Sequence, residues 1–283
     1  MVLVSPRNPL NIGAAARAMA NFGFARLIVV APYEPHWREA QAAAVGADDL
    51  LQNAMVTATL AEAVADCTLV VGTGTRVHRK PEQPVVLLPA LAPLVQKELA
   101  RGGRVAVVFG PEKHGLTRED LSYCHVLVEI PTHPRQPSMN LGQAVAVCLY
   151  ELAARLVSPD QEPSEGAPAL VPGVPPFRKR RERMGHGAIV VDPAGSSGRS
   201  ATAGELELLA GVAGQLMEAA EYSPAAMHEA NRHDLRLMLR RLALTGRDAR
   251  RILGLLRKTL RRLERGAGSG ADRKTDGAGG TAG

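Results

Sequence analysis

Three polar, glycine-containing segments carry the side chains best suited to chemistry. Residues 11–17 read NIGAAAR, residues 109–116 read FGPEKHGL, and residues 130–141 begin with IP and end with PSMNL. Each lies at the end of an apolar run or opens a helical one, and ligands of open parallel sheets bind beyond the carboxyl ends of the strands. Any one segment could be an ordinary turn in which Gly110 and Gly115 serve the backbone. Together the three segments predict a binding cleft.

Generic site motifs do not explain these segments. Residues 110–117 have the glycine spacing of a phosphate loop, but Leu116 stands where that loop requires Lys. Gly72 and Gly74 follow an apolar run, yet the third glycine of a dinucleotide fingerprint is missing. The eight histidines have no metal-ligand spacing with cysteines or carboxylates, so we expect no metal site. We expect His114 and His125 to be surface or core histidines.

Short apolar runs and helical segments must position the cleft. Strands are predicted at residues 2–5, 27–31, 68–72, 105–109 and 126–131, and helices at 12–22, 37–45, 60–65, 90–100, 117–123 and 141–156. This alternation predicts an α/β fold with a parallel sheet covered by helices on both faces. No apolar run approaches the roughly 20 residues of a membrane span. Three scattered cysteines, without a visible signal peptide, favour a cytoplasmic protein without disulfides.

Positive charge gathers in the last third of the chain. The net charge is +6, and 28 of the 34 basic side chains are arginines. Residues 1–157 hold 14 basic and 13 acidic side chains, whereas residues 178–265 hold 18 and 10. We therefore predict a chemistry domain at 1–157, a flexible linker with the basic run FRKRRER at 158–203, a helical basic domain at 204–265 that grips a polyanion, and a disordered Gly/Ala-rich tail at 266–283.

The three segments, in this order and at this spacing, resemble the signature motifs of the SpoU-type RNA ribose 2′-O-methyltransferases of the SPOUT class. The third extends as PSMNLGQAVAVCLYEL, and the resemblance covers about residues 2–157. GFARLIVVAP, AVGADDLLQNA and ADCTLVVGTGTR resemble the branch that methylates the tRNA anticodon loop. The resemblance implies an S-adenosyl-L-methionine (AdoMet)-dependent enzyme that methylates cytidine or uridine riboses of tRNA, although the first strand is short.

The resemblance also implies a site and an assembly. It implies a trefoil knot in the C-terminal part of the sheet, with AdoMet bound in the knot, and a homodimer with the knot helices at its interface. The implied AdoMet-binding residues are Thr73, Gly74, Thr75, Gly110, Ile130, Ser138, Met139 and Leu141. The implied catalytic residues are Arg17, Asn11, Glu112, Ser138 and Asn140, with Arg17 reaching the neighbour's active site.

Arg17 has two possible roles. A ribose 2′-hydroxyl is a poor nucleophile until its proton is removed or its lone pair is aimed. In the family this arginine is proposed as the base, although a guanidinium normally has a pKa above about 12. It could instead clamp the flanking phosphate and orient the hydroxyl. The other four residues would shape the site and hold Arg17, and Asn11 and Asn140 could also cap helices.

The last predicted helix is the candidate RNA-binding element. Thr245 resembles an N-cap with Asp248 three residues on, and Ile252, Leu256, Leu260 and Leu263 form an apolar stripe. The other face carries the expected RNA-binding residues Arg247, Arg250, Arg251, Arg257, Lys258, Arg261 and Arg262. A solvated helix face is the simpler interpretation, but acidic partners are almost absent, so we favour contact with tRNA phosphates.

Three alternatives stay open. The same ribose chemistry could act on rRNA, or the chain could be a non-catalytic RNA-binding module on a SPOUT scaffold. Base methylation is less favoured, because Arg17 in this context accompanies ribose chemistry in the family.

Overall fold

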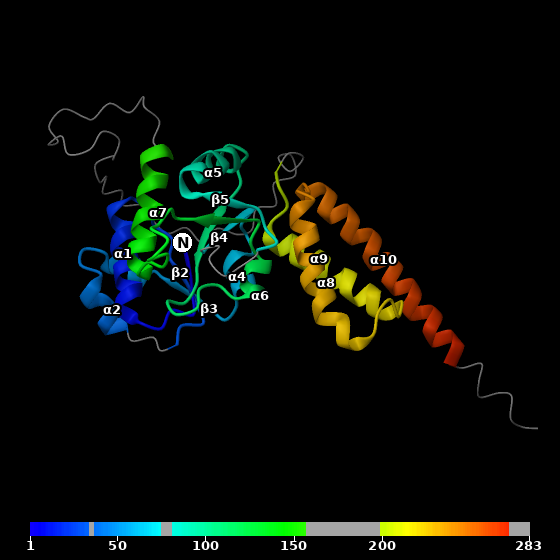
Figure 1. Ribbon diagram of the computed structural model, residues 1–283. Helices are drawn as coiled ribbons and strands as arrows, with labels where there is room; N and C mark the ends of the chain where they lie inside the picture. The colour runs from blue at the N-terminus through cyan, green and yellow to red at the C-terminus, as the bar shows by residue number, and fades with distance from the viewer. Residues whose placement is uncertain (34–36, 75–80, 157–198, 272–283) are drawn as a thin grey trace, which may run out of the picture.

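The computed structural model describes residues 1–33, 37–74, 81–156 and 199–271 (Figure 1). An α/β domain and a group of long helices lie side by side. Thr75, the basic run FRKRRER and most of the predicted linker lie outside the described residues. Within the part that is described, none of the helices has the length and apolar character needed to cross a membrane.

Seven parallel strands form one sheet, in the order β3-β2-β1-β6-β4-β7-β5. They are β1 (Val2–Val4), β2 (Ile28–Val30), β3 (Met55–Thr57), β4 (Leu69–Thr73), β5 (Val85–Leu87), β6 (Val105–Phe109) and β7 (Val126–Glu129). The predicted parallel sheet is confirmed, and all five predicted strands are present. Strand β7 lies between β4 and β5, which are consecutive in the chain. The path of the chain through a trefoil knot stays a prediction.

Helices cover both faces of the sheet, as predicted. One face carries α1 (Pro9–Asn21), α2 (Trp37–Ala43), α3 (Asp48–Gln52), η1 (Leu88–Ala90), α5 (Leu91–Ala100) and α7 (Leu141–Leu156). The other carries α4 (Leu60–Val64) and α6 (Arg118–Ser122). Leu3 points into the first core, whereas Val2 and Val4 point into the second. Strands buried on both faces must be apolar at every position, which explains their continuous Val/Leu/Ile runs.

The C-terminal helices have a core of their own. They are α8 (Ala203–Ala219), η2 (Ala225–Met227), α9 (His228–Arg241) and α10 (Gly246–Ala271), and we call them the helical region. Leu206, Leu209 and Leu239 are among its buried residues. Thr245 precedes α10, and its hydroxyl accepts a hydrogen bond from the Asp248 N–H (3.2 Å), as an N-cap does.

Two of the predicted boundaries differ from the bounds of the elements in the structure. The last predicted linker residues are ordered, because Ser200 forms an antiparallel bridge with Thr245 and Thr202 makes a capping box with Glu205 at the start of α8. Helix α10 continues to Ala271, six residues beyond the predicted end of the helical domain at residue 265, and residues 272–283 lie outside the described part of the chain.

Candidate active site

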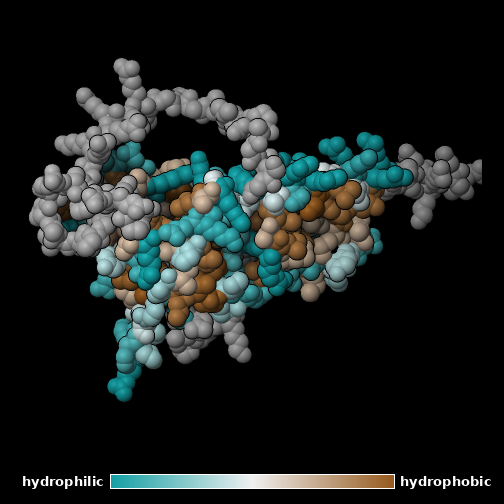
Figure 2. Space-filling model, turned by 90° about the horizontal axis from the view of Figure 1, so that it is seen from above, coloured by the Kyte–Doolittle hydropathy of each residue, from teal (hydrophilic) through white to brown (hydrophobic). Residues whose placement is uncertain are grey.

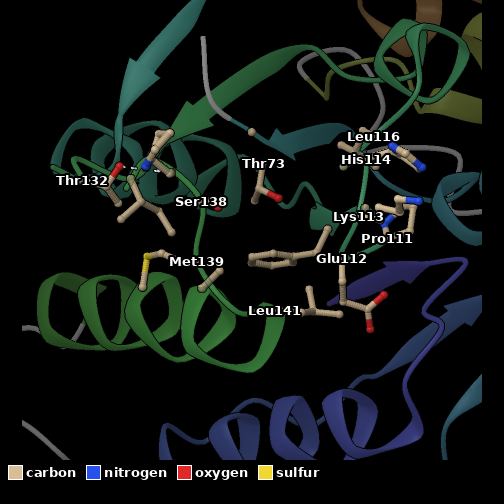
Figure 3. A pocket seen from close by; sticks show the side chains of 17 residues that line it. Thr73, Pro111, Glu112, Lys113, His114, Leu116, Thr132, Ser138, Met139 and Leu141 are labelled. Atoms are coloured by element: carbon tan, nitrogen blue, oxygen red, sulfur yellow. Dashed lines mark hydrogen bonds between the residues drawn. The ribbon is translucent and has the colours of Figure 1, made fainter. Parts of the chain in front are cut away.

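A cavity of about 320 Å³ lies beyond the carboxyl ends of β4, β6 and β7 (Figure 3). The loop after β6 forms one wall and the segment leading into α7 forms the opposite wall, with Thr73 of β4 between them. The cavity is lined by seven of the eight predicted AdoMet-binding residues, namely Thr73, Gly74, Gly110, Ile130, Ser138, Met139 and Leu141. The structure therefore brings two of the three motifs, together with the end of β4, around one cavity.

The loop of residues 110–116 is folded tightly against itself. Gly115 has a φ of 65°, in the left-handed region that favours glycine, and its N–H donates to the Pro111 carbonyl (2.8 Å). A Cβ on Gly110 would overlap the backbone of Gly115 and Leu116. Both glycines thus serve the backbone, as an ordinary turn would require, and that same turn forms the cavity wall.

Residues of all three motifs meet in one hydrogen-bond network beside the cavity. The Asn140 side-chain amide donates to Oδ1 of Asn11 (3.0 Å), and Nδ2 of Asn11 donates to Oε1 of Glu112 (2.7 Å). Glu112 also accepts from the backbone N–H groups of Arg7 (3.1 Å) and Asn8 (3.2 Å). The network ties the starts of α1 and α7 to the loop after β6. Asn11 lies 101 positions from Glu112 and 129 positions from Asn140 in the sequence.

The network keeps Glu112 ionised. Partial burial raises the pKa of the Glu112 carboxyl, but the hydrogen bonds from Asn11 and from backbone N–H groups outweigh burial and leave the pKa below its ordinary value. Glu112 is therefore a carboxylate at neutral pH, so both of its oxygens are acceptors and the groups that face them are donors. This fixes the amide of Asn11 with its nitrogen toward Glu112 and its oxygen toward Asn140.

The helix-capping predictions were half right. Asn140 caps α7, because its Oδ1 accepts from the Gly142 N–H (2.9 Å). Asn11 lies inside α1 instead, and Asn8 is the N-cap, accepting from the Leu10 N–H (3.0 Å). Sequence analysis missed Asn8, although Asn directly before a Pro at the first helical position is a known helix start. It also missed Thr132, whose hydroxyl donates to the Pro137 carbonyl (3.1 Å) and closes the loop that carries Ser138.

Arg17 does not join the other predicted catalytic residues within one chain. It is exposed on α1, does not line the cavity, and forms no hydrogen bond or ion pair with another described residue. The expectation that Asn11, Glu112, Ser138 and Asn140 hold Arg17 is therefore not met in the single chain. Six residues separate Arg17 from Asn11, which is a rotation of about 240° around a helix, so the two side chains leave α1 on different sides.

The two histidines of interest have different environments. His125 accepts a hydrogen bond from the Val70 N–H through Nδ1 (3.1 Å), and burial lowers its pKa to about 3, so it is a neutral core histidine. His114 is exposed on the cavity wall next to Lys113. No described His, Cys, Asp or Glu residues form a group of three that could hold a metal ion.

Helix α10 presents its basic face to solvent. All seven predicted RNA-binding residues on it are exposed. Arg250 pairs with Glu205 (2.9 Å), and none of the other six forms an ion pair with a described residue. Hydrophilic side chains gather along an edge of the helical region beside an apolar surface (Figure 2). The face is thus available to a polyanion.

Comparison with known proteins identifies the family. The model of the SpoU rRNA Methylase family matches residues 1–150. The chain belongs to this family. It is 40% identical over 165 residues to a tRNA (cytidine/uridine/adenosine-2′-O-)-methyltransferase TrmJ of Pseudomonas aeruginosa, covering 58% of this chain and 64% of that relative. It is 39% identical over 158 residues to a tRNA (cytidine-2′-O-)-methyltransferase TrmJ of Methanocaldococcus jannaschii, covering 56% and 68%.

A solved structure extends the likeness to the helical region. The crystal structure of TrmJ from Z. mobilis ZM4 superimposes with a TM-score of 0.71 and 30% identity, covering 91% of this chain and 97% of that chain. The P. aeruginosa relative, in contrast, is matched over just under two thirds of its own length. The likeness is therefore strongest for the SpoU domain, and the helical region follows the same architecture.

Proposed function

We propose that this protein transfers a methyl group from AdoMet to the ribose 2′-hydroxyl of a cytidine or uridine in the tRNA anticodon loop, and that it works in the cytoplasm. One observation carries the proposal: segments that match the SpoU motifs, far apart in the sequence, enclose one cavity at the carboxyl ends of β4, β6 and β7. The named activity of the TrmJ relatives supports tRNA as the substrate.

The cavity suits AdoMet in size and lining. Its volume lies at the lower end of the range for small-molecule sites, about 300–1,000 Å³. Leu116, Ile130 and Leu141 offer apolar surface to an adenine ring, while backbone groups at Gly74 and Gly110 offer polar contacts. The position of a Cβ on Gly74 is open space, so this glycine leaves room that a side chain would fill. When bound there, AdoMet supplies a methyl group already activated on a sulfonium.

The protein's part is to position the ribose. Ser138 is exposed at the cavity and can bond an incoming hydroxyl or phosphate. The Asn140–Asn11–Glu112 network holds both walls at a fixed separation, and positioning of the reacting atoms supplies much of such a rate enhancement. Arg17 would act on the neighbouring protomer's ribose, either by accepting the hydroxyl proton or by clamping the flanking phosphate.

We further propose a homodimer formed by α1 and α7. Leu10, Val147 and Tyr150 are large apolar side chains left exposed on these helices. Arg17 lies seven residues after Leu10, hence on the same face of α1. A partner that covers this face would bury the apolar side chains and bring Arg17 to the partner's cavity. Tyr150→Glu should therefore yield monomers in analytical ultracentrifugation and little methyl transfer.

The basic face of α10 would hold the RNA by its backbone. Six exposed cations without described acidic partners match a row of phosphates. Aromatic residues make up only 3% of the chain, so shape and phosphate contacts, rather than base stacking, should dominate recognition.

The direct test incubates purified protein with methyl-labelled AdoMet and unmodified tRNA. We expect labelled 2′-O-methylribose in the anticodon loop, and its absence with every tRNA and rRNA would refute the proposal. Label in rRNA alone would move the substrate to the ribosome. RNA binding without AdoMet binding in calorimetry would indicate a non-catalytic module. Arg17→Ala should abolish transfer but leave AdoMet affinity unchanged, whereas Arg38→Ala, exposed on α2, should change neither.

A further inference from the structure

The helical region is attached to the α/β domain at a pivot and at a joint. The pivot is the start of α8, where the N–H groups of Ala203 and Gly204 donate to the carbonyls of Cys67 (2.7 Å) and Ala65 (3.0 Å). The joint is the contact of Arg236 and Arg240 of α9 with the ring of Tyr123, directly after α6. In Figure 1, α6 faces α9 across the boundary.

The joint is buried and directional. The guanidinium carbon of Arg236 lies 4.5 Å from the centre of the Tyr123 ring, and that of Arg240 lies 5.6 Å from it. Tyr123, Arg236 and Arg240 are 8%, 9% and 7% exposed, respectively. A guanidinium over the face of an aromatic ring is attracted to it, and the attraction depends on the distance and angle between the guanidinium and ring planes. The attraction is stronger where water is excluded.

Arg236 is held rigidly before it meets Tyr123. Its Nε donates to both carboxylate oxygens of Glu207 on α8 (3.0 Å each), and its Nη2 donates to Oε1 (2.6 Å). This fork leaves the guanidinium plane little freedom. Its Nη1 also lies 3.8 Å from Glu119 of α6. Arg236 therefore connects α8 and α9 to α6 in one orientation.

The remaining boundary is loosely filled. Glu82 pairs with Arg118 (3.1 Å) and with His233 (3.5 Å), but Glu82 and Arg118 are exposed, and exposed pairs contribute little. A second cavity, of about 360 Å³, lies there between residues 81–83, α6 and His233. The pivot, with the nearby hydrogen bond from the Ser200 hydroxyl to Glu98 (3.4 Å), lies at one end of the boundary, and the joint adds the separate buried contact that can set the angle of the helical region.

The joint stands between the basic helix and the active site. Helix α10 packs on α8, which carries Glu207. On the other side, α6 begins at Arg118, two residues after Leu116, which lines the candidate AdoMet cavity. Phosphate contacts hold RNA without reading its sequence. The angle between α10 and the cavity therefore decides which ribose of a held RNA reaches the chemistry.

We propose that Arg236 and Tyr123 are positioning residues, which fix the angle of the RNA-binding α10 to the active site and so select the nucleotide that is methylated. The proposal rests on the proposed function for its substrate. Its geometric part, a fixed angle that depends on the Tyr123 ring, stands independently of any activity.

A distance measurement tests the geometric part. Cys67, Cys124 and Cys148 are buried and burial raises the pKa of each thiol to about 12, so cysteines introduced by Gln52→Cys and Gly254→Cys, both exposed, can be spin-labelled selectively. Double electron–electron resonance, on dimers in which only one protomer is labelled because the labelled protein was mixed with excess unlabelled protein, should give one narrow distance distribution. Tyr123→Phe keeps the ring and should keep it narrow, whereas Tyr123→Leu should broaden it. Equally narrow distributions in all three would overturn the proposal.

A kinetic measurement tests the functional part. Arg236→Met leaves the α/β core untouched, so it tests the joint even where Tyr123→Leu impairs folding. Arg241→Met is the control, because it removes an exposed charge from the same helix. In single turnovers we expect Arg236→Met to slow methylation about 10–100-fold and to spread it to neighbouring nucleotides. AdoMet and tRNA affinities should stay within about twofold of wild type.

Two kinetic results would overturn the positioning role. One is loss of tRNA affinity equal to the loss of rate, since that would make Arg236 a binding residue. The other is an unchanged rate and methylation site. If the wild-type protein itself transfers no methyl group, the proposed function fails, and the distance distributions still decide the joint.

Discussion

Replacing Glu112 by glutamine should loosen the junction of the three motifs. The carboxylate accepts hydrogen bonds from the Asn11 side chain and from the N–H groups of Arg7 and Asn8. Gln presents one oxygen, which can serve two of these donors, and turns its own N–H₂ toward the third. One of the three donors then has no acceptor, and the other two bond a neutral amide oxygen in place of a charged carboxylate oxygen.

The expected loss is about 1–2 kcal/mol in the free energy of unfolding. An unsatisfied donor costs about 1–3 kcal/mol when buried, and we take the lower part of that range because solvent reaches Glu112. In a protein of this size such a loss lowers the melting temperature by roughly 2–8 °C. Glu221→Gln, in an exposed turn after α8, is the control and should change the melting temperature by less than about 1 °C.

The effect should depend on pH in a defined direction. The pKa of Glu112 in the folded protein lies below its ordinary value of 4.5, so the carboxylate stabilises the fold above that pH. This stabilisation disappears as the pH falls through the lowered pKa, because the protonated carboxyl resembles the amide. Thermal melts from pH 8 to pH 3 should show a full difference between wild type and Glu112→Gln above pH 5, shrinking below pH 4. A difference that is constant across this range would refute the charge-based reasoning.

Three further predictions address the cavity, the core and the basic helix. Gly74→Val, which fills open space in the cavity, should weaken AdoMet binding in calorimetry at least about tenfold without lowering the melting temperature. Gly110→Ala should lower the melting temperature, because its Cβ would overlap the backbone of Gly115 and Leu116. An unaltered AdoMet affinity in Gly74→Val would place the cofactor elsewhere. The folded-state pKa of His125, about 3 against 6.5, means that the unfolded chain takes up a proton which the folded chain does not. Stability should thus fall by about 2 kcal/mol from pH 7 to pH 5, and denaturant titrations of His125→Asn should show a smaller fall. If α10 contacts five or six phosphates, the slope of log affinity against log salt for tRNA should be roughly −4 to −5, and Arg257→Gln with Arg261→Gln should reduce its size by about 1.5; no change would remove α10 from the interface.

The sheet could be predicted from the sequence except at its edges. The five predicted strands are buried on both faces, and their apolar runs are unmistakable. Strands β3 and β5 lie at the two edges, have three residues each, and leave Val56 55% and Leu87 49% exposed. An edge strand needs no second apolar face, so neither has a pattern that stands out from a loop. Helix α3 was missed for a similar reason, since its five residues bury only Leu51.

The candidate site was predicted where it depends on local spacing. The glycines, Ser138, Met139 and Leu141 lie within short segments whose residue types follow from the turn they make, and they line the cavity as expected. Helix rotation decided the rest. It placed Arg17 away from Asn11, and the start of α1 at Pro9 made Asn8, rather than Asn11, the N-cap.

The family motifs, the class of fold and the separation of a near-neutral segment from a basic one can be read from the amino-acid sequence, because composition and short-range spacing are properties of the chain. Which of these residues contact one another depends on the folded arrangement of the chain. Glu112 meets Asn11, and Arg236 meets Tyr123, across more than 100 residues. Such contacts depend on how helices pack and rotate against the sheet, and no pattern within one segment encodes them.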